Sequence, residues 1–199
     1  MKHTKKVYSP LGASNHSQKD RVEYDYYATN PQAVEYLLTF VNFHKKIMEP
    51  ACGENHIANV LRKHGHDVVC YDIINRTHDG TINIQDFLQT TDSDYFDGDI
   101  ITNPPYNLAK EFVERSMETV KSGNYVAMYL KLTFLEGKKR KELFKKYPPK
   151  YVYVSSSRMG CAENGELEKD GNWPAGAVAY AWYIWQKGFT GEPVIRWFN

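Results

Sequence analysis

The sequence predicts an α/β domain with a doubly wound, mostly parallel sheet. Apolar runs typical of buried strands alternate with helical patterns along residues 31–130, as expected for strands that are joined by crossover helices. Small, acidic or amide residues follow three of these runs, at Gly53, Asp72 and Asn103. Because the carboxyl ends of parallel strands meet at one edge of a sheet, where such folds bind ligands, we expect these residues to share a site.

The composition is that of an ordinary globular chain. Of 199 residues, 42% are hydrophobic and 25% are charged, and the formal net charge of +1 provides no overall field that would recruit nucleic acid. The three cysteines and seven histidines show no metal-ligand spacing. We expect a cytoplasmic protein without a membrane segment or a metal, a monomer or weak dimer, with a flexible basic arm over residues 1–24 and a single domain over residues 25–199.

The domain is expected to begin with an aromatic segment and a helix. Tyr26 and Tyr27 precede Thr29-Asn30-Pro31, where Thr29 or Asn30 can cap a helix that has Pro31 in its first turn. Apolar residues at helical spacing extend this helix to about residue 43. This segment either contacts a ligand or only caps the helix and packs its two tyrosines, and the sequence favours neither interpretation.

A strand, a tight turn and a second helix follow. Residues 46–50 read as a short apolar strand that breaks into small residues before Gly53, and a helix is expected over residues 54–65. Small residues let the backbone approach a ligand, and the helix N-terminus offers oriented N–H donors. This is the architecture of a nucleotide-binding loop.

The next two strands are each associated with an acidic residue. Residues 67–73 are predicted as a buried strand, and Asp72 lies 19 residues after Gly53. An acid at about this distance from a glycine loop can accept hydrogen bonds from both ribose hydroxyls, which we favour over a surface Asp that closes a strand. Residues 81–85 alternate as a short strand, and Asp86 after them can also be a helix cap.

The fourth strand ends in the stretch around which the site is organised. Residues 99–102 lead into Asn103-Pro104-Pro105-Tyr106, where the prolines cannot continue a sheet ladder and fix the geometry of the strand end. The Asn103 amide oxygen, the Pro104 carbonyl and the Tyr106 ring suit a planar ligand with an –NH2 group. A strand-to-loop turn without a function is the alternative.

The second half of the chain completes the predicted sheet and adds two segments of interest. Six of the nine residues at 138–146 are cations, which form either a solvated face or a phosphate-binding surface. The loop over residues 157–176 either closes over nucleic acid, with Arg158, Lys169 and Trp173 for phosphate and base contacts, or is a plain connector. The other expected elements are a helix at residues 108–120 and strands at residues 125–130, 151–155, 177–186 and, at the edge, 194–197.

The motifs and their order resemble those of S-adenosylmethionine-dependent amino methyltransferases of the Asn-Pro-Pro-Tyr type, best known in the DNA adenine N6 enzymes. The resemblance covers residues 25–130 and implies a Rossmann-like, seven-stranded sheet with an antiparallel last strand. The chain departs from the family at Asn55, where a second glycine is usual. Asn suits a left-handed conformation, but a side chain that reached the cofactor would weaken its binding.

The resemblance also implies the site residues. In it, the aromatic-Thr segment touches the amino acid end of S-adenosylmethionine, and the Asp-Phe pair meets its adenine. The implied cofactor-binding set is Tyr26, Tyr27, Ala28, Thr29, Glu49, Pro50, Ala51, Gly53, Asp72, Ile73, Asp86 and Phe87. The implied catalytic set is Asn103, Pro104, Pro105 and Tyr106.

The function that the resemblance implies is methyl transfer from S-adenosylmethionine to the N6 amine of adenine in DNA. No separate target-recognition domain is visible in the sequence, which keeps other substrates open. The alternatives are RNA adenine N6, the glutamine N5 amide of a protein, and a non-catalytic nucleic-acid-binding protein that keeps a decayed methyltransferase fold.

Overall fold

The central sheet of the described residues has eight strands in the order β10-β7-β9-β6-β5-β2-β3-β4. The structure, a computed structural model, describes residues 25–78, 80–90 and 96–199, so the basic arm predicted over residues 1–24 lies outside it. The strands of this sheet are β2 (Lys46–Glu49), β3 (Asp67–Asp72), β4 (Ile82–Ile84), β5 (Asp99–Thr102), β6 (Tyr125–Lys131), β7 (Tyr151–Ser155), β9 (Tyr180–Gln186) and β10 (Val194–Phe198).

Most neighbouring strands in this sheet are parallel, as predicted. Strand β2 pairs in parallel with β3 and β5, and β6 continues the parallel order beside β5. Strand β9 is antiparallel to both β6 and β7, in the position that the resemblance implies for the antiparallel strand. The edge strand predicted near the C-terminus is β10, which pairs in parallel with β7 and makes the sheet eight-stranded rather than seven-stranded.

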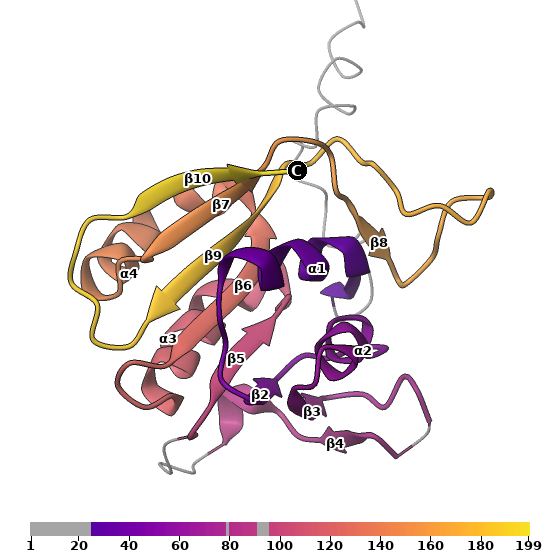
Figure 1. The fold of residues 1–199 in the computed structure, drawn as a ribbon, viewed down its shortest axis with the longest axis horizontal. Helices are drawn as coiled ribbons and strands as arrows, with labels where there is room; N and C mark the ends of the chain where they lie inside the picture. The colour runs from indigo at the N-terminus through magenta and orange to yellow at the C-terminus, as the bar shows by residue number, and fades with distance from the viewer. Residues whose placement is uncertain (1–24, 79, 91–95) are drawn as a thin grey trace, which may run out of the picture.

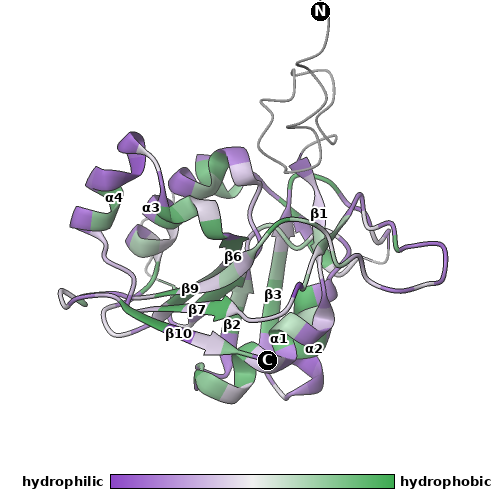
Figure 2. Cartoon of the chain, turned by 90° about the horizontal axis from the view of Figure 1, so that it is seen from above, coloured by the Kyte–Doolittle hydropathy of each residue, from purple (hydrophilic) through white to green (hydrophobic). Residues whose placement is uncertain are grey.

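Helices cover both faces of the sheet and enclose two cores. Figures 1 and 2 show α1 and α2 on one face and α3 and α4 on the other. Apolar side chains of each pair point at the strands, with Leu37 and Leu61 in one core and Val113 and Leu143 in the other. The helices are α1 (Pro31–Phe40), α2 (His56–Lys63), α3 (Ala109–Thr119) and α4 (Lys141–Lys146), with 3-10 turns η4 (Phe87–Gln89), η5 (Tyr106–Leu108), η6 (Leu132–Leu135) and η7 (Lys138–Arg140).

The first helix begins where the capping signal predicts. The Asn30 side chain accepts a hydrogen bond from the N–H of Gln32 at 2.9 Å, and Pro31 occupies the first helical position. The helix ends at Phe40, three residues before the predicted end, because the backbone is extended at Val41. The cap is therefore Asn30, not Thr29.

A second, two-stranded sheet was not predicted from the sequence. Strand β1 (Tyr27–Thr29) pairs antiparallel with β8 (Cys161–Glu163), and Thr29 lies opposite Cys161. Three residues are too few to show the alternation that identifies a strand. This pairing ties the start of the domain to the long loop between β7 and β9, which projects from one side of the molecule in Figure 1.

The described residues contain no helix that is long and apolar enough to cross a membrane. They also contain no group of three or more His, Cys, Asp or Glu side chains arranged to hold a metal ion.

Candidate active site

One cavity of about 280 Å³ lies at the edge of the sheet where the parallel strands end. This volume is just below the usual range of small-molecule pockets, roughly 300–1,000 Å³. Most of the residues that the sequence singled out come together in its wall. These are Tyr26, Tyr27, Pro50, Ala51, Asp72, Ile73, Asp86, Phe87, Asn103 and Pro105.

The loop after β2 is held close to the end of β3. The N–H of Gly53 donates to Asp72 Oδ2 at 2.8 Å, and the N–H of Ile74 donates to Asp72 Oδ1 at 3.0 Å. Gly53 has a φ of +52°, and a Cβ on it would lie 2.3 Å from a ring carbon of Tyr26. Each Asp72 oxygen accepts one of these backbone bonds and keeps a further lone pair for a ligand.

Asn55, which stands where the resembled family usually has a second glycine, adopts a left-handed backbone conformation. Its φ of +65° is in the left-handed region, and its amide nitrogen donates to Thr81 Oγ1 at 2.8 Å. Asn is the residue after Gly that best tolerates this conformation. The side chain is buried and does not belong to the cavity wall, so it leaves the space before Asp72 open.

Glu49 does not line the cavity. Its side chain is buried at the end of β2, beside Cys70 and Arg62, and one of its carboxylate oxygens has no hydrogen-bond partner among the described residues. Burial raises the pKa of Glu49 well above its usual value. Ala28 and Thr29 are also buried, in β1, and neither lines the cavity, although the resemblance implied contact with a cofactor.

Asp86 is a cap, as one of its two interpretations predicted, and Asp86 and Phe87 both line the cavity. Asp86 Oδ1 accepts the N–H of Leu88 at 2.9 Å and so caps η4, while the residue also lines the cavity. Phe87 is buried, and its ring centroid lies 5.5 Å from that of Phe112, which lines the cavity as well. The cavity therefore has an acidic group beside an apolar wall at this end.

Asn103 is fixed through its amide nitrogen. Nδ2 donates to the Tyr27 carbonyl and to Thr29 Oγ1, both at 2.9 Å, and also reaches Cys161 Sγ at 3.6 Å. The amide oxygen, Oδ1, is buried without a hydrogen-bond partner among the described residues. Because Asn103 lines the cavity, the site holds an acceptor whose orientation is set from behind by the β1–β8 sheet.

Tyr106 is anchored by its hydroxyl and covered by a cation. Its hydroxyl contacts Cys161 Sγ at 3.5 Å, and its ring centroid lies 5.2 Å from that of Tyr27. Lys131 Nζ lies 4.4 Å from the Tyr106 ring centroid and 5.5 Å from that of Tyr27. Burial raises the pKa of the Tyr106 hydroxyl well above its usual value and that of the Cys161 thiol to about 11, so both groups are neutral at pH 7.

The structure adds residues to the site that the sequence did not indicate. The Arg76 guanidinium lies 4.2 Å from the Tyr26 ring centroid in the cavity wall, and Asp25, also in the wall, accepts the N–H of Asn107 at 3.0 Å. Both residues lie in irregular segments without a motif, so no local signal marks them. Leu88, Gln89, Leu108 and Phe112 complete the wall.

Solved structures with the same fold are known, although the sequence matches no protein-family model and no curated protein. A putative class I S-adenosylmethionine-dependent methyltransferase from Listeria monocytogenes superposes with a TM-score of 0.60 and 15% identity over 90% of this chain and 68% of that one. A predicted O-methyltransferase from Agrobacterium tumefaciens gives a TM-score of 0.61 and 10% identity over 82% of this chain and 85% of that one.

A third structure comes from a restriction system. The M protein of the type I restriction enzyme EcoKI gives a TM-score of 0.57 and 15% identity, over 84% of this chain and 45% of that one, so this chain spans about half of that protein. At these identities the likeness establishes the fold. The chain has the Rossmann-like fold of class I methyltransferases.

Proposed function

We propose that the protein is an S-adenosylmethionine-dependent methyltransferase that modifies the N6 amine of adenine in nucleic acid, with DNA as the first candidate. The observation that carries this proposal is the buried, unpartnered Oδ1 of Asn103, a residue that lines the cavity. A buried acceptor without a partner is costly, and beside a cavity a donor on a bound ligand can satisfy it.

The cavity residues fit the cofactor. The Asp72 carboxylate has lone pairs free for ribose hydroxyls, and Asp86, which also lines the cavity, can accept from the adenine amine beside Phe87. Three carboxylates, of Asp25, Asp72 and Asp86, line the cavity and suit a ligand with ammonium and sulfonium charges. When bound, S-adenosylmethionine supplies an electrophilic methyl group.

The residues beyond the cofactor would prepare the target amine. The lone pair of an adenine amine is delocalised into the ring, which makes the amine a poor nucleophile. Hydrogen bonds from the –NH2 group to Asn103 Oδ1 and to the Pro104 carbonyl favour tetrahedral geometry at nitrogen and free the lone pair for attack. The methylated amine is acidic and loses its proton to solvent, so no general base is required. Tyr106 and Tyr27 offer rings beside which the base can be held.

A protein glutamine amide is the second candidate, because its –NH2 group presents the same two donors. One observation favours it: residues 163–170, next to the β1–β8 sheet, carry Glu163, Glu166, Glu168 and Asp170 against a single cation, which suits a basic protein. The first candidate keeps priority because the aromatic pair Tyr27 and Tyr106 suits a flat base better than an amide.

The test is to incubate the full chain with methyl-labelled S-adenosylmethionine and DNA, RNA or protein, and then to identify the methylated group by mass spectrometry after digestion. We expect N6-methyladenine in nucleic acid. Asn103→Ala should bind the cofactor with wild-type affinity in calorimetry and lose methyl transfer. Asn107→Ala, a neighbouring exposed amide outside the cavity wall, is the matched control and should retain activity.

If label appears on glutamine, the second candidate replaces the first. If the cofactor binds neither the wild type nor Asn103→Ala, the protein is not a methyltransferase. If Asn103→Ala transfers methyl groups near the wild-type rate, the acceptor role of Asn103 is wrong.

A further inference from the structure

The surroundings of Asn103 have opposite charges on two sides. Lys131 covers the Tyr106 ring, and a small hollow of about 80 Å³ joins Tyr106 and Lys131 to Arg140. This hollow leads to what we call the basic segment, which consists of Lys131, Lys138, Lys139, Arg140 and Lys141. The basic segment therefore begins next to Tyr106.

The charges of the basic segment are available to a ligand. Lys138, Lys139 and Lys141 are exposed, and none of them forms an ion pair within the described part of the chain. Arg140 donates to the Thr133 and Glu136 carbonyls, which hold the turn in place without neutralising its charge. By contrast, two other cations of the same region are paired, Lys145 with Glu142 at 2.9 Å and Lys146 with Glu118 at 4.0 Å.

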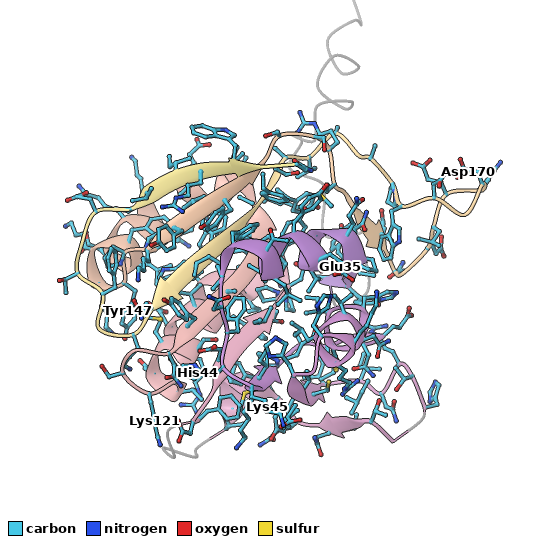
Figure 3. The ribbon with its side chains drawn as sticks, viewed as in Figure 1. Glu35, His44, Lys45, Lys121, Tyr147 and Asp170 are labelled. Carbon is cyan, nitrogen blue, oxygen red and sulfur yellow. The ribbon has the colours of Figure 1, made fainter. Side chains whose placement is uncertain are left out.

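The opposite side carries the acidic loop, residues 163–170. Glu163 lies opposite Tyr27 in the β1–β8 sheet, and the N–H of Asn164 donates to the Tyr26 carbonyl at 3.1 Å, so the loop starts at the cavity wall. All four of its carboxylates are exposed, and Asp170 lies at the far tip in Figure 3. Figures 1 and 2 show α4, which begins at Lys141 of the basic segment, and this loop on opposite sides of the molecule.

We propose that the substrate surface binds a single strand of nucleic acid, with its phosphates along the basic segment, and that the acidic loop disfavours a duplex. A duplex that placed its target base over Asn103 would present a second phosphate backbone, and the acidic loop would repel it. A single strand presents one backbone, which the basic segment can neutralise while the base lies beside Tyr106. This inference rests on the proposed function, from which it takes nucleic acid as the substrate. It adds that the substrate is a single strand and that its phosphates lie on the side of the basic segment.

This arrangement changes the role predicted for the loop over residues 157–176. The sequence suggested that Arg158, Lys169 and Trp173 contact nucleic acid. In the structure Trp173 packs edge-on against His56, with ring centroids 5.3 Å apart, and Lys169 is a single cation among four carboxylates. The acidic loop thus repels a second phosphate backbone, and the basic segment makes the contacts to phosphate.

The experiment measures binding of a fluorescein-labelled oligodeoxynucleotide to the full chain by anisotropy, without cofactor, as a salt series. The probe is used as a single strand and annealed to its complement, and an RNA strand of the same sequence separates the two sugar types. We expect the single strand to bind at least about tenfold more tightly than the duplex.

Two sets of variants locate the surface. Lys138→Gln/Lys139→Gln/Lys141→Gln should lower the slope of log K against log salt by about 2, since each phosphate contact to a single strand contributes roughly 0.7. Lys145→Gln/Lys146→Gln, the matched control from the paired cations, should leave the slope within about 0.5 of the wild type. Glu166→Gln/Glu168→Gln/Asp170→Asn should tighten duplex binding and leave single-strand binding nearly unchanged.

The outcomes separate this inference from the proposed function. Equal or tighter binding of duplex, no binding of either probe, or the same loss in the control as in the triple variant would overturn the inference, whatever the methylation assay shows. Binding that follows the expected pattern in a protein that methylates no nucleic acid would keep the strand surface and reject the proposed function.

Discussion

The side-chain nitrogen of Asn103 lies 2.9 Å from Thr29 Oγ1, so a residue of the small β1–β8 sheet orients the residue that we assign to the target amine. Turning the Asn103 carboxamide over would place its oxygen against the Tyr27 carbonyl and lose that hydrogen bond, so the carbonyl sets which way the amide faces while Thr29 holds the amide in place. Thr29 is therefore a positioning residue for the acceptor, a different role from the cofactor contact that the resemblance implies.

We expect Thr29→Val to lower kcat by about 10- to 100-fold, because a misplaced catalytic group costs rate even when binding survives. The affinity for S-adenosylmethionine should stay at the wild-type value, since Thr29 does not line the cavity. Thr29→Ser, which keeps the hydroxyl, should restore most of the rate. Steady-state kinetics and calorimetry on the three proteins provide the measurement, and a slow Thr29→Ser variant would point to packing of the methyl group instead.

Asp72→Ala should weaken cofactor binding by about 10- to 100-fold for each lost hydrogen bond, because bonds to a charged group contribute roughly 1.5–3 kcal/mol. It should also loosen the loop at Gly53, whose N–H donates to this carboxylate. Asp67→Ala, at the start of the same strand in an exposed ion pair with Lys45, is the control and should bind normally. Titration calorimetry together with circular dichroism checks this, and unchanged affinity in a folded Asp72→Ala protein removes Asp72 from the site.

Asn55→Ala should unfold more easily than Asn55→Gly by about 1–2 kcal/mol, the cost of a left-handed conformation for a residue with a Cβ. Urea unfolding of both variants measures this difference. Their cofactor affinities should equal that of the wild type, because the Asn55 side chain contacts Thr81 and not the cavity. A large gain of affinity in Asn55→Gly would instead show that the side chain hinders the cofactor.

Glu49→Gln should raise the free energy of unfolding, and the gain should grow with pH. Burial raises the pKa of Glu49 in the folded state above its unfolded value of about 4.3, so the folded state holds the proton more tightly. Between the two pKa values, the wild type loses stability as pH rises, at up to about 1.4 kcal/mol per pH unit. Urea unfolding at pH 4 and pH 8 compares the two proteins, and a gain that is the same at both pH values would show that Glu49 does not titrate in this window.

The strands and helices that carry motifs were predictable because their patterns are long or bounded by strong signals. The runs before Gly53, Asp72 and Asn103 are apolar, and each is followed by a residue with a known role at a strand end. These three positions converge as predicted, since parallel order brings the strand ends to one edge.

The parts that could not be predicted depend on contacts between distant segments. The pairing of Thr29 with Cys161 leaves no periodic signal in either three-residue strand. Arg76 reaches the cavity from an irregular segment, where no pattern distinguishes it from a solvated cation. The sequence also does not show that Glu49 is buried outside the cavity wall, because an acid at the end of a buried strand can lie in the wall or in the core.

The β1–β8 sheet also has a consequence for the order in which the protein assembles. Asn103 is 76 residues from Tyr27 and 58 from Cys161 along the chain, so the three segments meet only after most of the central sheet has closed the distance between them. Three residue pairs hold the small sheet, and it lies outside the central ladder. We therefore expect its amides to exchange with solvent faster than those of β5 and β6, through local openings that release the Asn103 carboxamide while the rest of the domain stays folded.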